Sequence, residues 1–178
     1  MKQLIPAVNS KDHMSGNPAA LIELVEYGDY ECPYCGRAYP IVKDIQQKLG
    51  RELKFVFRNF PLSKIHPRAF SAAVAVEAAD LQRRFWEMHD IIFENQKTLE
   101  EADIFLFAQN VGLDLERFKN DIQQTPLIER VEKDFETGIR SGVNGTPTFF
   151  INGEKYQGDW SGGQLLADLQ DRLADLPH

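Results

Sequence analysis

The sequence predicts an α/β fold in which a block of helices interrupts a sheet. Runs rich in apolar, β-branched and aromatic residues lie at 20–27 and 53–62, and a shorter run lies at 148–151. From about residue 66 to residue 138, the apolar positions follow a helical period instead. The strands before and after this block can share one sheet, so we expect one α/β unit with a helical insertion.

The first part of the predicted sheet consists of two strands and the helix between them. Residues 20–27 (ALIELVEY) form an apolar run that ends at a Gly-Asp turn signal. A helix is expected after the two cysteines, with Gly50 as its stop and with apolar positions at Ile41, Val42, Ile45 and Leu49. Residues 53–62 (LKFVFRNFPL) are rich in Phe and Val, and Pro61 ends this second strand.

The helical block and the last strands follow in the chain. Helical periodicity covers residues 69–96, 100–112, 115–123 and 127–142. The strand TFFI at 148–151 comes next, and Asn152-Gly153 is a strong hairpin signal before the returning segment EKYQG. An amphipathic helix closes the chain, with apolar positions at Leu165, Leu166, Leu169 and Leu173.

The domain organisation follows from this order of elements. A chain of 178 residues suits one domain, or one domain with a sizeable insertion. We expect residues 1–63 and 139–178 to form the α/β domain and residues 64–138 to form the helical insertion.

Composition and charge exclude several classes of partner. The chain is 43% hydrophobic and 26% charged, which is typical of a globular protein. Its formal net charge of -7 repels nucleic acid and anionic lipid, so we expect neither nucleic acid nor a membrane as a partner. No apolar run reaches the length of a membrane-spanning helix.

The N-terminal segment bears on the cellular location. Its apolar patch, Leu4 to Val8, is broken by Pro6 and is too short for the core of a signal peptide. We therefore expect a cytoplasmic protein, and the alternative is the mature form of an exported protein.

Cys32 and Cys35, the only cysteines, stand one helical turn apart in YGDYECPYCGRAYP. Cys32 lies where a helix N-cap belongs, and Pro33 falls at the first helical position, which favours proline. A helix dipole supplies at most about 2 kcal/mol, or roughly 1.5 pKa units, so a strongly acidic thiol also needs direct donors. The amides of Tyr34 and Cys35 and the Cys35 thiol can provide them. The spacing predicts a redox dithiol in which Cys32 attacks and Cys35 resolves.

Two other interpretations of the cysteines stay open at this point. A zinc site needs about four ligands, so His66 and His89 would have to complete it, although their spacing fits no common zinc motif. His89 is expected on a partly exposed helix face. The cysteines could also be inert packing residues, but such residues have no reason to occupy an N-cap.

The sequence resembles the DsbA-like thiol–disulfide oxidoreductases of the thioredoxin superfamily. The resemblance rests on strand-CPYC-helix at 20–49, on GTPTFFINGE at 145–154, and on the helical block between them, and it covers the chain from about Asn17. It implies a thioredoxin fold with an inserted α-helical subdomain. It also implies that the Thr146–Pro147 bond is cis and faces the cysteines, whereas an ordinary trans proline would start an edge strand.

The resemblance also assigns a role to an acid on the first strand. Glu26 matches a buried acid that is expected to relay the proton of Cys35, and Arg58 on the neighbouring strand would offset its charge. The alternative for both residues is a strand-end ion pair at the surface.

The function implied is thiol–disulfide exchange with protein or small-molecule thiols and disulfides, together with an unidentified redox partner. We expect no bound cofactor and no metal, because the dithiol is itself the redox group. Pro33 and Tyr34 tune the potential, and the lack of a His between the cysteines predicts a less oxidising pair than the family's strongest oxidants. The alternatives are a glutathione-linked reductase or transferase, which Asp29 and Glu31 disfavour by charge, and a non-catalytic client-binding module.

Overall fold

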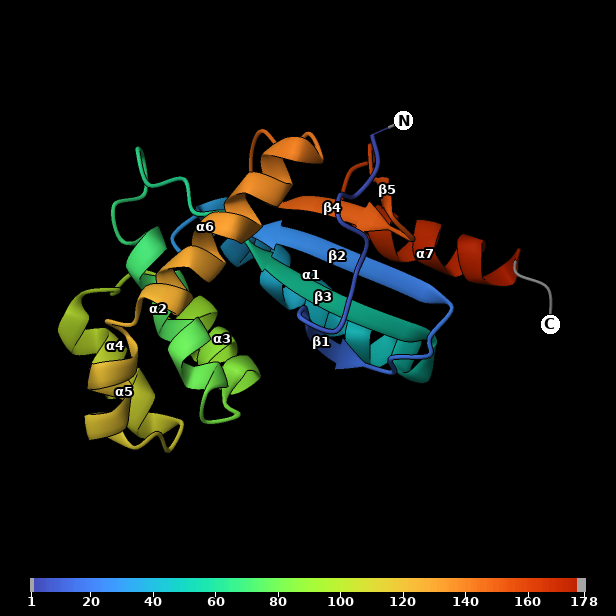
Figure 1. Cartoon of the computed structure of the whole chain (residues 1–178). Helices are drawn as coiled ribbons and strands as arrows, with labels where there is room; N and C mark the ends of the chain where they lie inside the picture. Colours follow the sequence, from blue (N-terminus) through green and yellow to red (C-terminus); the bar gives the residue numbers. More distant parts are fainter. Residues whose placement is uncertain (1, 176–178) are drawn as a thin grey trace.

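The computed structural model describes residues 2–175, and a mixed five-stranded sheet forms its centre (Figure 1). The strands lie in the order β1-β3-β2-β4-β5, and only β2 and β3 pair in parallel. They are β1 (His13–Gly16), β2 (Ile22–Gly28), β3 (Leu53–Asn59), β4 (Thr148–Ile151) and β5 (Glu154–Lys155). The strands predicted at both ends of the sequence do share one sheet.

Seven α-helices accompany the sheet within the described residues. They are α1 (Pro33–Leu49), α2 (Ala69–Asp80), α3 (Phe85–Glu94), α4 (Glu101–Asn110), α5 (Leu115–Asp121), α6 (Thr125–Arg140) and α7 (Gln164–Ala174). Helices α2 to α6 lie between β3 and β4 in the chain, which confirms the predicted α/β class with a helical block. The boundaries 64–138 stay a prediction, and α6 continues through Arg140.

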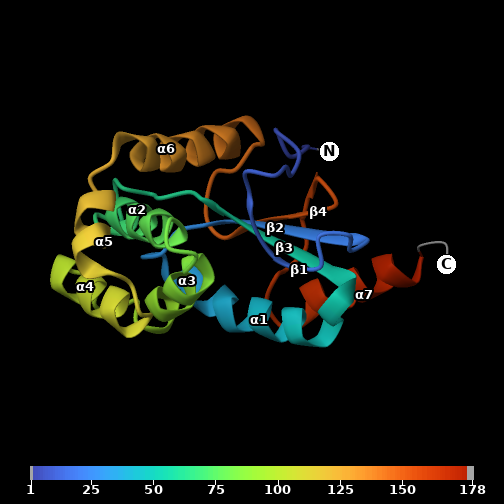
Figure 2. The same cartoon turned by 60° about the horizontal axis from the view of Figure 1, so that its bottom comes forward.

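The two faces of the sheet carry different cores. Helices α1 and α7 cover one face, and α6 and the N-terminal segment cover the other (Figure 2). Because side chains alternate along a strand, Leu24 of β2 belongs to the core under α1, whereas Val25 and Tyr27 belong to the opposite core. The same alternation decides which polar side chains of β2 and β3 can reach the cysteines.

Two features of the fold differ from the sequence-based expectation. Strand β1 was not predicted, because its four residues, HMSG, have no period-2 pattern; its partner β3 supplies the pairing. The helical run at 69–96 is divided into α2 and α3, and Arg83 between them has a positive φ of 59°.

Candidate active site

The two cysteines lie at the corner where β2 passes into α1. Cys32 is the N-cap of α1, with an extended backbone (φ -69°, ψ 122°), and Pro33 occupies the first helical position, as predicted. Cys35 follows one turn later, and both thiols are free. Cys32 is 3% exposed and Cys35 is 0% exposed, so of the two residues only Cys32 has any surface that a substrate can reach.

The surroundings of Cys32 favour its thiolate. A hydrogen bond from the Cys35 thiol is the largest influence and lowers the pKa of Cys32 to about 5, against the opposing effect of burial. A bond from Thr146 and the backbone amides of Cys35 and Tyr34 lower the pKa further. These are the direct donors that a strongly acidic thiol needs in addition to the helix dipole.

The loop before β4 faces Cys32. The Thr146–Pro147 peptide bond is cis, as the family resemblance implied. The Thr146 carbonyl oxygen accepts a hydrogen bond from the Cys32 thiol at 3.5 Å. The Thr146 hydroxyl is buried and has no other partner among residues 2–175, so it can donate to the sulfur once Cys32 is ionised.

Cys35 has the opposite character. Burial, followed by its hydrogen bond to Cys32 and the charge of Glu26, raises the pKa of the Cys35 thiol well above its usual value. The backbone N–H of Asp29 donates to its sulfur at 3.4 Å. The pair therefore combines one thiol that ionises readily with one that stays protonated, which is the asymmetry that sequential attack and resolution need.

Glu26 is buried on β2, on the face that α1 covers. It is 3% exposed, and burial, followed by the charge of Cys32, raises its pKa to about 8. It also lines a small cavity of about 30 Å³ between α1 and α3, together with Lys43 and Gln46. That volume is sufficient for one water molecule in the cavity that Glu26 lines.

The expected offset of Glu26 by Arg58 is wrong. In the parallel register Arg58 is opposite Tyr27, and Glu26 is opposite Phe57, so the two charged side chains point to opposite faces of the sheet. Arg58 is buried against Asp12, with Nε and Nη2 each donating to that carboxylate at 2.8 and 2.9 Å. Because both Glu26 and Arg58 are buried, a surface ion pair between them is also excluded.

Tyr34 is exposed beside the cysteines, with 55% of its surface accessible. The guanidinium of Arg37 lies 4.5 Å from the centre of its ring, within the range of a cation–π contact. Arg37 thus places a positive charge beside Tyr34, whose own side chain is neutral.

Asp29 has a role at the site that the sequence did not predict, since the sequence indicates only a negative charge there that disfavours glutathione. Its buried carboxylate accepts hydrogen bonds from the backbone amides of Glu31 (2.8 Å), Cys32 (3.1 Å) and Leu62 (2.8 Å). His66 Nδ1 lies 2.8 Å from the same carboxylate. The bonds to the second and third residues after Asp29 form an Asx turn, which the Gly-Asp signal could have indicated. Asp29 is therefore part of the turn and is not presented to an anionic ligand as a surface charge.

The two histidines of the zinc alternative have other partners. His66 faces Asp29, and His89 Nδ1 lies 2.9 Å from the Tyr30 hydroxyl. His89, expected on a partly exposed face, is instead buried in an aromatic cluster, and burial lowers its pKa to about 3. Across the described part of the chain, no three His, Cys, Asp or Glu side chains are grouped as a metal ion would need.

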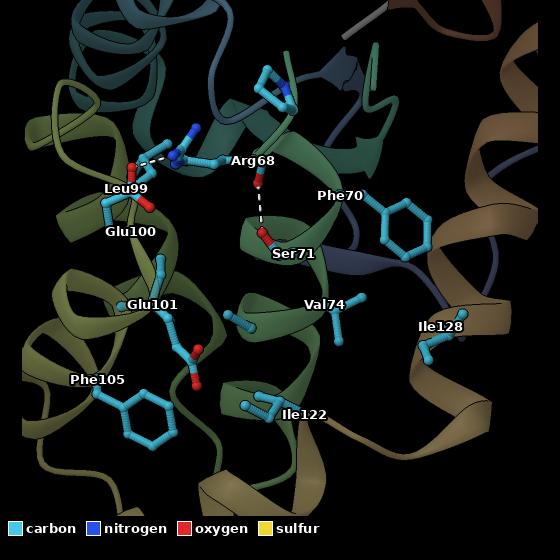
Figure 3. Close-up of a pocket in the computed structure, with 13 residues that line it drawn as sticks. Arg68, Phe70, Ser71, Val74, Leu99, Glu100, Glu101, Phe105, Ile122 and Ile128 are labelled. Atoms are coloured by element: carbon cyan, nitrogen blue, oxygen red, sulfur yellow. Dashed lines mark hydrogen bonds and ion pairs between the residues drawn. The ribbon is translucent and has the colours of Figure 1, made fainter. Parts of the chain in front are cut away.

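A larger hollow lies on the helical block, separate from the cysteines. This groove of about 610 Å³ is lined mainly by apolar side chains of α2, α4 and α6, among them Val74, Phe105 and Ile128 (Figure 3). At one end Arg68 pairs with Glu100, and its backbone amide donates to Glu31 beside Cys32 at 2.6 Å. The groove thus begins next to the active-site turn but contains neither sulfur.

Comparison with protein families identifies the fold. The model of a thioredoxin family, described as "Thioredoxin", matches residues 8–171. The chain belongs to the thioredoxin family. Together with the CPYC pair and the helical block, this match confirms the DsbA-like resemblance that the sequence predicted.

Solved thioredoxin-like structures agree with this assignment. A thioredoxin-like oxidoreductase from Silicibacter pomeroyi DSS-3 has a TM-score of 0.83 and 26% identity, and the match covers 95% of each chain. BdbD from Bacillus subtilis matches at a TM-score of 0.79 with 24% identity, over 92% of this chain and 93% of that one. The predicted thioredoxin fold is therefore confirmed, and at the family level this fold is that of an oxidoreductase.

Curated relatives of the chain are much longer proteins. A protein named Na(+)/H(+) antiporter NhaA 1 from Mycolicibacterium gilvum is 41% identical over 172 residues. The match covers 96% of this chain and 28% of that protein. A relative named Na(+)/H(+) antiporter NhaA from Herminiimonas arsenicoxydans is 38% identical, over 89% of this chain and 25% of its own length. None of the helices within residues 2–175 is long and apolar enough to cross a bilayer.

Proposed function

We propose that this protein catalyses thiol–disulfide exchange on protein or small-molecule thiols and disulfides, with Cys32 attacking and Cys35 resolving. One observation carries the proposal: two free thiols with opposite pKa shifts lie one turn apart at a helix N-terminus, and a cis-proline loop faces the first of them. An inert pair of packing cysteines would not produce this asymmetry.

The reaction takes place in two exchanges. The Cys32 thiolate attacks one sulfur of a substrate disulfide, the substrate S–S bond breaks, and the other substrate sulfur leaves as a thiolate that takes up a proton. Cys35 then gives its proton to the Glu26 carboxylate and attacks Cys32, which releases the second substrate thiol and leaves a Cys32–Cys35 disulfide. The substrate gains two electrons and the dithiol loses two; the reverse sequence oxidises a dithiol substrate.

Cysteine variants test this proposal directly, with insulin disulfide reduction driven by dithiothreitol as the assay. We expect Cys32→Ser to lose the catalysed rate and Cys35→Ser to accumulate a mixed disulfide at Cys32 that mass spectrometry can locate. Gln109→Ala, on an exposed position of α4, is the control and should retain full activity. A Cys32→Ser variant as active as the parent would contradict the proposal.

The direction of electron flow depends on the midpoint potential. Because Tyr34 cannot hold the thiolate with a positive charge of its own, we expect a pair less oxidising than the family's strongest oxidants. Equilibration in graded thiol–disulfide buffers measures this value. A midpoint near the cytosolic poise, about −220 to −320 mV, would support reductase work in the cytoplasm, whereas one above about −180 mV would support an oxidant acting outside it.

The two alternatives make different predictions. A glutathione-linked enzyme needs cations for the two glutathione carboxylates. Here an anion, Glu31, lies between Cys32 and the groove, where its carboxylate accepts a hydrogen bond from the Arg68 amide. Activity with glutathione as sole reductant would support it. A client-binding module predicts that client capture survives replacement of both cysteines, and loss of capture would exclude it.

A further inference from the structure

Gln96 reaches the active site from the loop between α3 and α4. It is half-buried, whereas residues 94, 95, 97 and 98 on either side are exposed. Figure 2 shows α3 beside the first turn of α1, which brings this loop to the cysteine turn. The Gln96 carboxamide is therefore directed inward, against the residues that carry Cys32.

The contacts of Gln96 are with the backbone of that turn. Its Nε2 donates to the Tyr30 carbonyl at 2.9 Å and to the Cys32 carbonyl at 3.0 Å. The Cys32 carbonyl also accepts the Gly36 amide at 3.0 Å, in the first hydrogen bond of α1. The Gln96 side chain thus bridges the carbonyl of Tyr30 and the carbonyl of the N-cap residue, Cys32.

The sequence leaves space for this side chain at Gly36. Gly36 lies inside α1 and does not have a positive φ, so its backbone does not require glycine. Glycine inside a helix lowers stability by roughly 0.5–1 kcal/mol relative to alanine. Local structure therefore gives no reason for a glycine at this position. A Cβ at this position would overlap the Gln96 carboxamide. The absent side chain of Gly36 is what allows Gln96 to reach the two carbonyls.

We propose that Gln96 is a positioning residue for Cys32, holding the cysteine turn from the helical block through the space that Gly36 leaves open. This inference rests on the proposed function, since it concerns how the same sulfur is presented. The amides of Tyr34 and Cys35 stabilise the thiolate only while the turn keeps them aimed at it, and Gln96 fixes the carbonyls on the N-terminal side of that turn.

The test compares Gln96→Ala, Gln96→Glu, Gly36→Ala and the double variant Gln96→Ala/Gly36→Ala. The readouts are the pH at which Cys32 alkylation is half-maximal and the midpoint potential, neither of which a merely structural residue would shift. Losing a net hydrogen bond corresponds to a rise of about 0.4–1 pKa unit, so we expect alkylation well below pH 5, where Cys32 is mostly protonated, to slow about three- to tenfold in Gln96→Ala. Gln96→Glu replaces the donor by an acceptor of the same shape and should slow it at least as much.

Coupling between the two positions is the sharper prediction. Because Gly36→Ala displaces the Gln96 carboxamide, it should reproduce the Gln96→Ala effect, and the double variant should be no slower than either single variant. Gln109→Ala is the matched control for loss of an exposed glutamine and should match the parent. If Gly36→Ala does not fold, the two Gln96 variants alone decide the matter.

Failure of this inference is distinguishable from failure of the proposed function. Suppose that Cys32 of the parent is acidic. If the folded Gln96 variants then have the same Cys32 pKa as the parent, Gln96 is not a positioning residue. The same conclusion follows if the effects of Gln96→Ala and Gly36→Ala on Cys32 alkylation add in the double variant. If the parent thiol itself titrates like free cysteine, the proposed function fails first.

Discussion

At the scale of single residues, Cys32 and Cys35 share a helix but not an environment. Cys32 receives donors at the N-terminus of α1, whereas Cys35 is enclosed and lies under the influence of Glu26. The motif alone indicated which sulfur attacks, because the N-cap position and Pro33 are visible in the sequence. It could not show that the Thr146 hydroxyl, which is distant in the chain, lies beside Cys32.

Replacing Thr146 by Val should make Cys32 less acidic. Valine keeps the shape of threonine but removes the hydroxyl that can donate to the thiolate. A hydrogen bond to a charged group is worth about 1.5–3 kcal/mol, so we expect the pKa of Cys32 to rise by about one to two units. The pH dependence of Cys32 alkylation measures this, and an unchanged titration would show that the hydroxyl plays no part.

Replacing Glu26 by Gln should separate stability from catalysis. Burial raises the folded-state pKa of Glu26 from 4.5 to about 8, so the ionised carboxyl is more favourable in the unfolded chain. The free energy of unfolding should therefore fall as pH rises from 4.5 to about 8, by at most about 1.4 kcal/mol per pH unit. Gln cannot ionise, so this contribution should disappear and the variant should be more stable than the parent at neutral pH.

The same Glu26→Gln variant should resolve mixed disulfides about tenfold more slowly or worse, because Cys35 loses its proton acceptor. Rapid-quench measurement of mixed-disulfide decay against pH gives this rate. A variant that is more stable but resolves as fast as the parent would remove Glu26 from the mechanism.

At the scale of elements, side-chain alternation along β2 and β3 separates Glu26, the proposed proton acceptor, from the ion pair of Asp12 and Arg58. Glu26 faces α1, and Arg58 faces the N-terminal segment, where it binds Asp12 and the carbonyl of Pro6. The sequence pattern predicts both residues on neighbouring strands, where the structure has them, but it does not supply the register of those strands. A shift of one residue decides which face a side chain occupies, and only the paired strands fix it.

The pair of Asp12 and Arg58 should hold the N-terminal segment to the sheet. We expect Asp12→Asn to destabilise the protein by about 3 kcal/mol, since it leaves a buried guanidinium without its counter-charge. Although burial opposes it, hydrogen bonding from Arg58 lowers the pKa of Asp12 below 3.8, so its contribution is present above that value and is lost as the pH falls.

Urea unfolding at several pH values measures both effects. The matched control is Asp44→Asn, which breaks an exposed ion pair with Lys48 on α1 and should cost no more than about 0.5 kcal/mol. The role given to the Asp12–Arg58 pair would be contradicted if the two substitutions lowered the free energy of unfolding equally. It would also be contradicted if the stability of Asp12→Asn fell with decreasing pH as much as that of the parent.

At the scale of the whole molecule, the helical block and the sheet share one core and one polar network. Asn59, at the end of β3, donates from its side chain to Glu77 of α2 at 2.8 Å and from its backbone to Asp134 of α6 at 3.0 Å. His13 of β1 lies 2.8 Å from the same Glu77. Periodicity predicted the helices in the block, but not these contacts, because they join four elements that are distant in the sequence.

This connection predicts that the sheet and the helical block unfold together. Trp86 lies on α3 and Trp160 lies just before α7, so Trp86→Phe and Trp160→Phe each leave one fluorescent probe, in a different part of the molecule. The urea transition of each variant by fluorescence should coincide with its own transition by circular dichroism. A fluorescence transition displaced from the circular dichroism transition in either variant would show that the two parts unfold separately.

The central claim is that Cys32 ionises far more readily than an ordinary thiol, and its alkylation rate as a function of pH tests this most directly. Iodoacetamide modification, with Cys32 and Cys35 quantified separately by peptide mass spectrometry, should give a half-maximal rate for Cys32 near pH 5. Cys35 should remain unmodified until the protein unfolds. A Cys32 rate that becomes half-maximal only near pH 8.5, the value of a free cysteine, would contradict the account.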